Sequence, residues 1–293
     1  MDGILNILKP PGMTSHDIVS RMRRLTRERK IGHGGTLDPG AAGVLPVFLG
    51  KATRLIEYGI EWDKAYRVEL TLGGRSETGD DASEIFWDSV EKYPSLEEVK
   101  SILASFVGDQ EQIPPMYSAL KVNGKKLYEL AREGIVIERQ ARPITIHKIQ
   151  LLSYEAPILR FDVDCSKGTY IRTLCEDMAA QFGLNGVMTF LLRTRAGAFS
   201  IQDAILPKED IMDWESLMID GVFAVENFPE LILNYEDGVR FCSGQRLALA
   251  EESFEGKVRV TANQIFLGIG EVNSRVLSAK KVFVDLRKEK DIL

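Results

Sequence analysis

Cysteine, histidine and long apolar runs are scarce in this sequence of 293 residues. The cysteines Cys165, Cys175 and Cys242 have neither metal-ligand spacing nor an even count, which argues against a disulfide framework and predicts a reducing cytoplasmic location. The three histidines are scattered, so no metal site is expected. No apolar run approaches the length of a membrane span, and the N-terminus has no basic region before an apolar one. These absences predict a globular cytoplasmic protein.

Basic residues are fewer than acidic ones, which gives a net charge of -6. Taken as a sum, this value argues against a nucleic-acid partner. The distribution is uneven, however: residues 1–60 carry nine Lys and Arg against five Asp and Glu, and residues 121–200 carry twelve against eight. Attraction to phosphate acts within about 8 Å at physiological salt, so a local basic face matters more than the total. RNA therefore stays a possible partner.

The stretch from Gly32 to Gly43 is the most unusual part of the chain. Its glycines and alanines suit neither a core helix nor a strand, and they allow a loop that approaches a ligand closely. A Walker A phosphate loop is excluded, because Leu45 and Ala52 stand where its first glycine and its hydroxyl residue would be. An esterase loop is disfavoured, because no Gly-x-Ser-x-Gly elbow is present.

Asp38 is the candidate reactive group of this loop. Pro39 biases it toward an extended conformation, and the small neighbouring residues leave its carboxylate accessible. An aspartate before a proline in a turn also commonly accepts a hydrogen bond from a local backbone N–H. Taken alone, this pattern favours the structural interpretation.

The string GHGGTLDP, followed by GAAGVLPV, resembles the signature of the bacterial tRNA pseudouridine synthase B (TruB) family. Further strings resemble the family's other motifs and follow in the family's order: KPPGMTS at 9–15, KAYRV at 64–68, IPPMYSALK at 113–121 and SKGTYIRT at 166–173. The resemblance covers residues 1 to about 200. It implies an isomerase that converts uridine 55 in the T arm of tRNA to pseudouridine.

The same resemblance implies the partners and the site. The reaction rearranges one nucleotide, so no cofactor is expected; the partner is the T stem-loop of tRNA, without guide RNA, and the protein is expected to be a monomer. The implied catalytic residues are Asp38 beside C1′ and C6, Arg172 as its counter-ion, and Tyr66 as the stacking residue and a candidate for C5 proton transfer. The remaining implied residues are His33, Tyr170 and Leu191 at the substrate, with Lys9 and Pro10 as supports of the Asp38 loop. Whether Asp38 attacks C1′, attacks C6 or acts through a glycal is left open.

The order of elements predicts an α+β fold. Strands are predicted at 4–8, 66–72, 135–137, 144–152 and 158–165, and helices at 14–27, 95–107, 125–133 and 169–182. Without regular βαβ alternation, this order indicates a mixed or antiparallel sheet. We expect a catalytic domain over 1–225 and a small β-rich domain, PUA-like by the resemblance, over 226–293, with strands at 258–261, 266–272 and 281–284.

Other charged segments have a plain surface interpretation as well as a functional one. Six basic residues at 21–30 and the lysines Lys121, Lys125 and Lys126 are predicted to contact RNA phosphates, although many lysines and arginines simply cover a solvated surface. The acidic residues at 77–84 lack metal-binding spacing and predict a solvated loop. Two alternatives to an unguided synthase remain: a non-catalytic tRNA-binding factor, and a synthase directed by a guide RNA.

Overall fold

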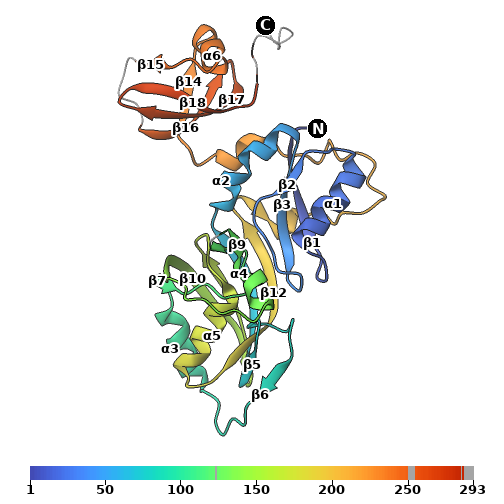
Figure 1. Cartoon of the computed structure of the whole chain (residues 1–293), viewed down its shortest axis with the longest axis vertical. Helices are drawn as coiled ribbons and strands as arrows, with labels where there is room; N and C mark the ends of the chain where they lie inside the picture. Colours follow the sequence, from blue (N-terminus) through green and yellow to red (C-terminus); the bar gives the residue numbers. More distant parts are fainter. Residues whose placement is uncertain (123, 250–254, 285, 287–293) are drawn as a thin grey trace.

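The computed structural model describes residues 1–122, 124–249, 255–284 and 286. The molecule is elongated, with a large sheet in its lower part and a second sheet near the C-terminus (Figure 1). The large sheet has nine strands. Its main path is β1 (Gly3–Lys9), β3 (Ala42–Leu49), β12 (Gly186–Ala196), β4 (Lys64–Leu72), β11 (Ile158–Cys165), β10 (Arg142–Glu155) and β7 (Gly108–Gln112), with β2 (Ile31–His33) beside β3 and β13 (Phe199–Ser200) beside β12.

A short seam joins the two halves of this sheet. Strands β3 and β12 pair in parallel at only two positions, Leu192 with Ala42 and Arg193 with Gly43, whereas the other neighbouring strands run antiparallel. Gly43 is required at the seam: its φ is +122°, and a Cβ there would lie 2.2 Å from the carbonyl oxygen of Arg193. The sheet is therefore mixed, and the predicted α+β class is confirmed.

Helices cover each half of the sheet separately. Helix α1 (Ser15–Thr26) packs Ile18 and Met22 into a core with β1 and β3. Helices α3 (Leu96–Ser105) and α5 (Ile171–Gln181) pack on β10, β4 and β12 over the largest core cluster. The predicted N-caps are present, because Thr14 and Ser95 each form a capping box with the residue three positions on.

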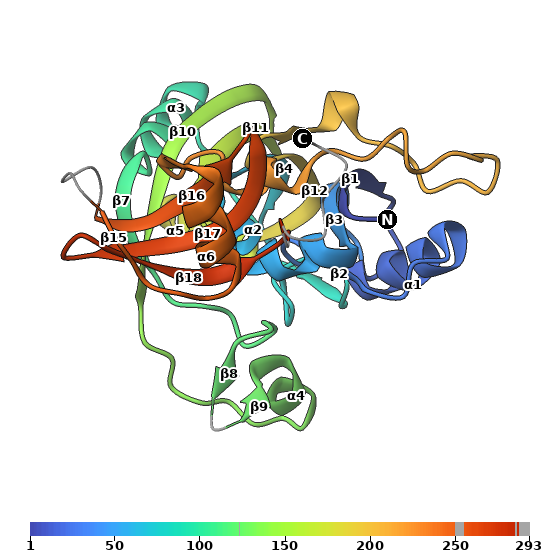
Figure 2. The same cartoon turned by 90° about the horizontal axis from the view of Figure 1, so that it is seen from above.

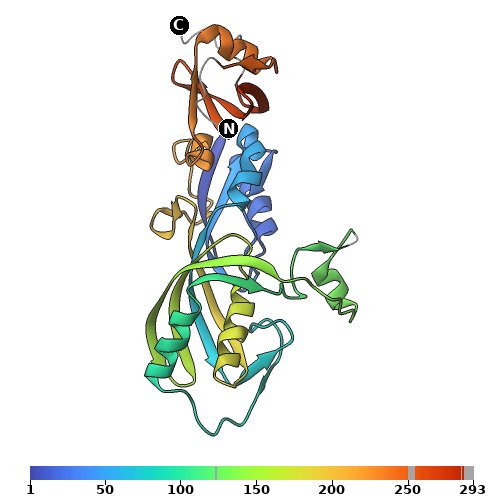
Figure 3. The same ribbon diagram turned by 90° about the vertical axis from the view of Figure 1, so that its left-hand side faces the viewer.

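An arm projects from the body between β7 and β10. It contains β8 (Lys121–Val122), β9 (Lys125–Lys126) and α4 (Leu127–Arg132), and Figures 2 and 3 show it standing away from the sheet. The helix predicted at 125–133 thus begins two residues late, because Lys125 and Lys126 pair with the preceding strand. The strand predicted at 135–137 is wrong: this segment belongs to no helix or strand, and Val136 is 75% exposed. A β-branched run forms no strand when no neighbouring strand pairs with it.

The C-terminal sheet has five strands in the order β14 (Glu230–Leu233), β16 (Gly256–Ala262), β17 (Ile265–Asn273), β18 (Val276–Val282) and β15 (Leu247–Ala248). Helix α6 (Tyr235–Cys242) packs its Phe241 into the core of this sheet. The sheet also contacts the body, where Ile269 joins the core cluster of Phe48 and Tyr58, and Lys281 pairs with Glu57 at 3.2 Å. Tyr58 is part of α2 (Ile56–Ile60), which follows the 3-10 helix at Gly50–Leu55.

Candidate active site

The loop between β2 and β3 carries Asp38 and is fixed at several backbone positions. The hydroxyl of Ser15 accepts a hydrogen bond from Leu37 N at 2.9 Å, and Gly12 N donates to Pro39 O at 2.8 Å. Ala41 N donates to Asp38 O at 3.1 Å and closes the turn. These bonds hold the backbone on both sides of Asp38 and leave its carboxylate 39% exposed.

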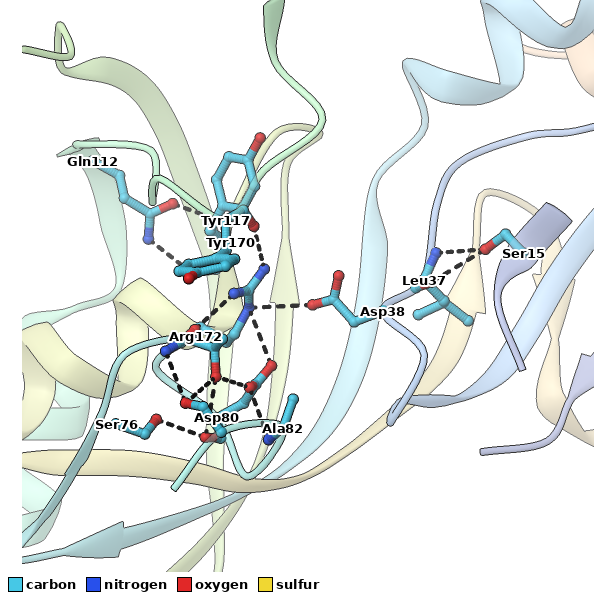
Figure 4. A network of polar contacts seen from close by, with 12 residues as sticks. Ser15, Leu37, Asp38, Ser76, Asp80, Ala82, Gln112, Tyr117, Tyr170 and Arg172 are labelled. Carbon is cyan, nitrogen blue, oxygen red and sulfur yellow. Dashed lines mark hydrogen bonds and ion pairs between the residues drawn. The ribbon is translucent and has the colours of Figure 1, made fainter. Parts of the chain in front are cut away.

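Arg172 meets this carboxylate from α5. Its Nε lies 3.2 Å from Asp38 Oδ2 and 3.6 Å from Asp80 Oδ2, and the guanidinium thus lies between two carboxylates from different loops (Figure 4). Its two terminal nitrogens donate to the carbonyl oxygens of Thr78 at 2.7 Å and Tyr117 at 2.8 Å. Only 7% of the Arg172 side chain is exposed. Its position is therefore fixed by four groups on three separate segments.

The surroundings of Asp38 act on its charge in opposite directions. Burial raises the pKa of the Asp38 carboxyl, and the charge of Asp80 raises it further, whereas Arg172 and Lys9 lower it. Arginine suits this role because it stays protonated when it is removed from water. The loop therefore holds a partly buried carboxylate whose ionised form is favoured by Arg172.

Asp80 is a member of this group that the sequence analysis misplaced. The acidic loop at 77–84 was expected to be solvated, but the Asp80 side chain is only 9% exposed. The loop runs between β5 (Gly74–Ser76) and β6 (Ile85–Trp87), and Met188 N bonds to Gly79 O at 3.1 Å, which draws it against β12. Asp80 also accepts hydrogen bonds from Thr78 and from Ala82 N. Sequence spacing could not reveal this pairing, because Arg172 lies far away along the chain.

Lys9 lies buried beneath the Asp38 loop. Its Nζ donates to the carbonyl oxygens of Pro10 at 3.0 Å, Pro39 at 3.2 Å and Ala41 at 2.6 Å. Burial lowers the pKa of Lys9 to about 8, and the nearby Asp38 opposes that shift. Lys9 thus contacts the loop at two carbonyl oxygens that follow Asp38 in the chain.

Tyr66 and Leu191 lie on neighbouring strands, β4 and β12, and belong to the largest core cluster together with Leu37 and Ala41 of the loop. They are 8% and 9% exposed. The ring of Tyr66 therefore forms part of the floor of the site and does not stand free in it. Burial raises the pKa of the Tyr66 hydroxyl to about 12, and Arg193 on the adjacent strand opposes that shift.

His33 and Tyr170 are both partly exposed near the loop and the guanidinium. Burial and the charge of Arg193 lower the pKa of His33, so its imidazole is neutral near neutral pH. Tyr170 precedes α5, and its backbone N and O pair with the side chain of Gln112 at 2.8 and 3.0 Å. Figure 4 shows the Tyr170 ring beside Arg172.

The base of the arm adjoins the same guanidinium. A cavity of about 340 Å³ is lined by Thr78 and Arg172 on one side and by Pro115, Tyr117 and Val136 of the arm on the other. Tyr117 also donates its hydroxyl to Glu77 at 2.6 Å. The lysines Lys121, Lys125 and Lys126 lie farther out on the arm, where Lys125 pairs with Glu133 at 3.5 Å. Arg172 therefore contacts both the arm, at the carbonyl oxygen of Tyr117, and the carboxylates of Asp38 and Asp80.

This arrangement suits chemistry at an electron-poor carbon. The carboxylate of Asp38 is exposed and has a fixed counter-ion, so it can attack carbon or stabilise positive charge on a sugar. Within the described residues, no group of three or more His, Cys, Asp and Glu side chains is placed to hold a metal ion. In the same part of the chain, no helix combines the length and apolar character needed to cross a membrane.

Solved structures share this fold. A chain in the crystal structure of a Cbf5-Nop10-Gar1 complex matches with a TM-score of 0.75 and 24% identity, over 96% of this chain and 85% of that one. A chain in the structure of an H/ACA RNP bound to a substrate RNA containing 2'-deoxyuridine matches with a TM-score of 0.72 and 23% identity, over 96% and 85%. At these identities the likeness establishes the fold alone.

Sequence comparisons identify the family as well as the fold. Residues 23–171 match the TruB family pseudouridylate synthase (N terminal domain), and residues 229–283 match the C-terminal domain of pseudouridine synthase II TruB. Proteins named tRNA pseudouridine synthase B are similar over nearly the full length: that of Alkaliphilus oremlandii is 44% identical over 94% of both chains, and that of Pelotomaculum thermopropionicum is 40% identical over 97% of this chain and 95% of its own.

Fold, site and sequence together define a pseudouridine synthase, an isomerase that converts uridine in RNA to pseudouridine. The chain belongs to the TruB family of these enzymes. The match of the second domain also supports the PUA-like character expected of the C-terminal sheet. The predicted domain limits, 1–225 and 226–293, stay a prediction, and the last residues of that range lie outside the described part of the chain.

Proposed function

We propose that this enzyme acts in the cytoplasm on tRNA and isomerises uridine 55 of the T loop, without guide RNA and as a monomer. The proposal rests on one observation above all: the exposed carboxylate of Asp38 lies 3.2 Å from the buried guanidinium of Arg172 at the seam of the sheet. The similarity to proteins named tRNA pseudouridine synthase B supports tRNA as the substrate.

In the proposed reaction, the N1–C1′ bond of uridine breaks, the detached uracil turns, and C5 bonds to C1′. C5 then loses its proton and N1 gains one, so the product is an isomer and no cofactor enters the balance. Asp38 stabilises or traps the sugar while the bond is broken, and the charge of Arg172 favours its ionised form. Lys9 and Pro10 support the loop from below.

The target base must leave the T loop to reach this site, which costs a few kcal/mol. Stacking on an aromatic ring returns about 1–3 kcal/mol per base, so stacking on Tyr66 in the floor of the site offsets much of this cost, and Leu191 adds an apolar contact to the base. His33 occupies or props the space that the base leaves, and Tyr170 contacts the flipped nucleotide. The basic residues at 21–30 and the arm lysines then contact the phosphates of the stem.

Release of tritium from C5 tests the proposal directly. The purified chain alone is incubated with a T-arm transcript that carries C5-tritiated uridine, and pseudouridine is then mapped in the product. We expect release from position 55, and none from a matched transcript with cytidine at that position. Tight binding without release would favour a non-catalytic tRNA-binding factor, and release only after addition of a second RNA would favour guided synthesis.

Replacing Tyr66 with phenylalanine separates stacking from proton transfer. The ring remains in the floor of the site, so KM should change little, whereas kcat should fall by about 10²- to 10⁴-fold if the hydroxyl moves the C5 proton. Tritium release measured at saturating and at low tRNA concentrations gives both constants. A Tyr66→Phe enzyme that turns over at the wild-type rate would rule out the proton-transfer role.

A further inference from the structure

Arg193 is the largest fully buried side chain next to the site, and the sequence analysis assigned it no role. It lies on β12 at the seam of the sheet, where it pairs with Gly43 of β3 on one side and with Tyr66 of β4 on the other. It is only 1% exposed. One arginine is thus in register with the strand that follows the Asp38 loop and with the strand that carries Tyr66.

Its guanidinium is held mainly by the glycine loop. Nε donates to Val44 O at 2.7 Å, Nη1 to Thr36 O at 3.2 Å, and Nη2 to Gly35 O at 3.3 Å. Among the described residues, no carboxylate lies within ion-pair distance of Arg193. Burying a charge without an ion-pair partner is costly, so a purely structural arginine would be expected to have one.

The side chain of Tyr66 is the remaining partner. Tyr66 is directly opposite Arg193 on the neighbouring strand, so the two buried side chains lie next to each other on one face of the sheet. Because guanidinium nitrogens only donate, Arg193 can meet the phenol only at its oxygen. This leaves the hydroxyl proton free to point elsewhere. The guanidinium also lowers the pKa of Tyr66 against the larger effect of burial. One planar group thus donates to the backbone before Asp38 and lies beside the side chain of Tyr66.

We propose that Arg193 is a positioning residue for pseudouridine formation, which fixes the phenolic oxygen of Tyr66 relative to the Gly35–Thr36 backbone of the Asp38 loop. The inference rests on the proposed role of Tyr66 in proton transfer. Its planar guanidinium matters as well as its charge, because it donates to three carbonyl oxygens and lies opposite Tyr66. Lysine would keep the charge but could not span these acceptors.

A double-mutant cycle tests the connection. Arg193→Lys in the wild-type background should lower kcat by about 10- to 100-fold, as expected for loss of a hydrogen bond to a charged group, with little change in KM for tRNA. In the Tyr66→Phe background the hydroxyl is already absent, so the same substitution should lower kcat by less than about threefold. A merely structural arginine would lower kcat equally in both backgrounds.

Arg195→Lys is the matched control, because Arg195 lies two positions along the same strand and pairs with Asp164 at 2.7 Å outside the site. It should leave kcat unchanged. Wild-type kcat in Arg193→Lys, or equal losses in both backgrounds, would overturn the inference. Thermal unfolding of each variant shows whether the loss in Arg193→Lys comes from the unfolded fraction, and a loss explained in that way would also overturn it.

The outcomes separate this inference from the proposed function. If Tyr66→Phe itself turns over at the wild-type rate, the proton-transfer role of Tyr66 is refuted and the inference falls with it. If Tyr66→Phe is slow and the effect of Arg193→Lys simply adds to it, the role of Tyr66 stands and only the inference is refuted. Non-additive losses support both.

Discussion

Replacing Asp38 with asparagine is expected to lower kcat for pseudouridine formation by at least about 10⁴-fold, because the amide can neither attack carbon nor stabilise a positive sugar. Asparagine has nearly the same shape, and the hydrogen bonds that fix the loop involve its backbone and neighbours rather than the carboxylate. The loop should therefore keep its conformation. Tritium release in single-turnover experiments measures the loss of chemistry.

The Asp38→Asn enzyme should still bind tRNA. Phosphate contacts dominate the affinity of proteins for nucleic acids, and Asp38 is an anion, so the Kd for tRNA should change by less than about threefold. Asp203→Asn provides a control at an exposed aspartate away from the site and should keep full activity. Retained turnover in Asp38→Asn would refute Asp38 as the catalytic carboxylate. A large loss of binding would show instead that the substitution disturbs the loop.

Local sequence signals predicted the frame of this site well. The capping boxes at Thr14 and Ser95, the strand through Tyr66 and the glycine-rich loop with Asp38 all depend on neighbours within a few residues. Such signals act through backbone geometry and short-range hydrogen bonds, which a sequence displays directly. The family motifs added the expectation that Arg172 belongs beside Asp38, and the structure places the two together.

The parts that the sequence did not reveal depend on long-range contacts. Asp80 looks like one of several solvated acidic residues until the loop packs on β12 and brings it to Arg172. Arg193 looks like an ordinary strand residue until the parallel pairing of β3 with β12 places it under the loop. The reverse error occurred at 135–137, where β-branched residues without a partner strand form no strand. The outcome in each case depends on whether a segment far away along the chain packs against the residue.

These long-range contacts explain how the site tolerates its own charges. Lys9 and Arg193 are buried under the loop and are stabilised mainly by its carbonyl oxygens, while Arg172 lies between Asp38 and Asp80. Backbone carbonyls aimed at a cation can replace part of its hydration without adding a second full charge. The loop is therefore fixed by cations below it, and its one carboxylate stays partly exposed.

Replacing Arg172 should also have a large effect, and that effect should depend on pH. Arg172→Met removes the main group that lowers the pKa of Asp38, so burial and Asp80 would raise that pKa further. Because the proposed role of Asp38 requires its anion, the acid limb of kcat/KM should move to higher pH, and kcat/KM at neutral pH should fall by about 10³-fold. Rates of tritium release across a pH series measure both effects.

Two comparisons make this result specific to Arg172. Arg172→Lys keeps a positive charge but cannot reach Asp38, Asp80 and the two carbonyl oxygens together, so its acid limb should move less than that of Arg172→Met while its kcat still falls. Arg67→Lys alters a similar pair, with Asp162 on the exposed side of β4, and should change neither. An unshifted acid limb in Arg172→Met would mean that Asp38 stays ionised without its guanidinium. The 3.2 Å pair would then orient the loop and would not be the source of its charge.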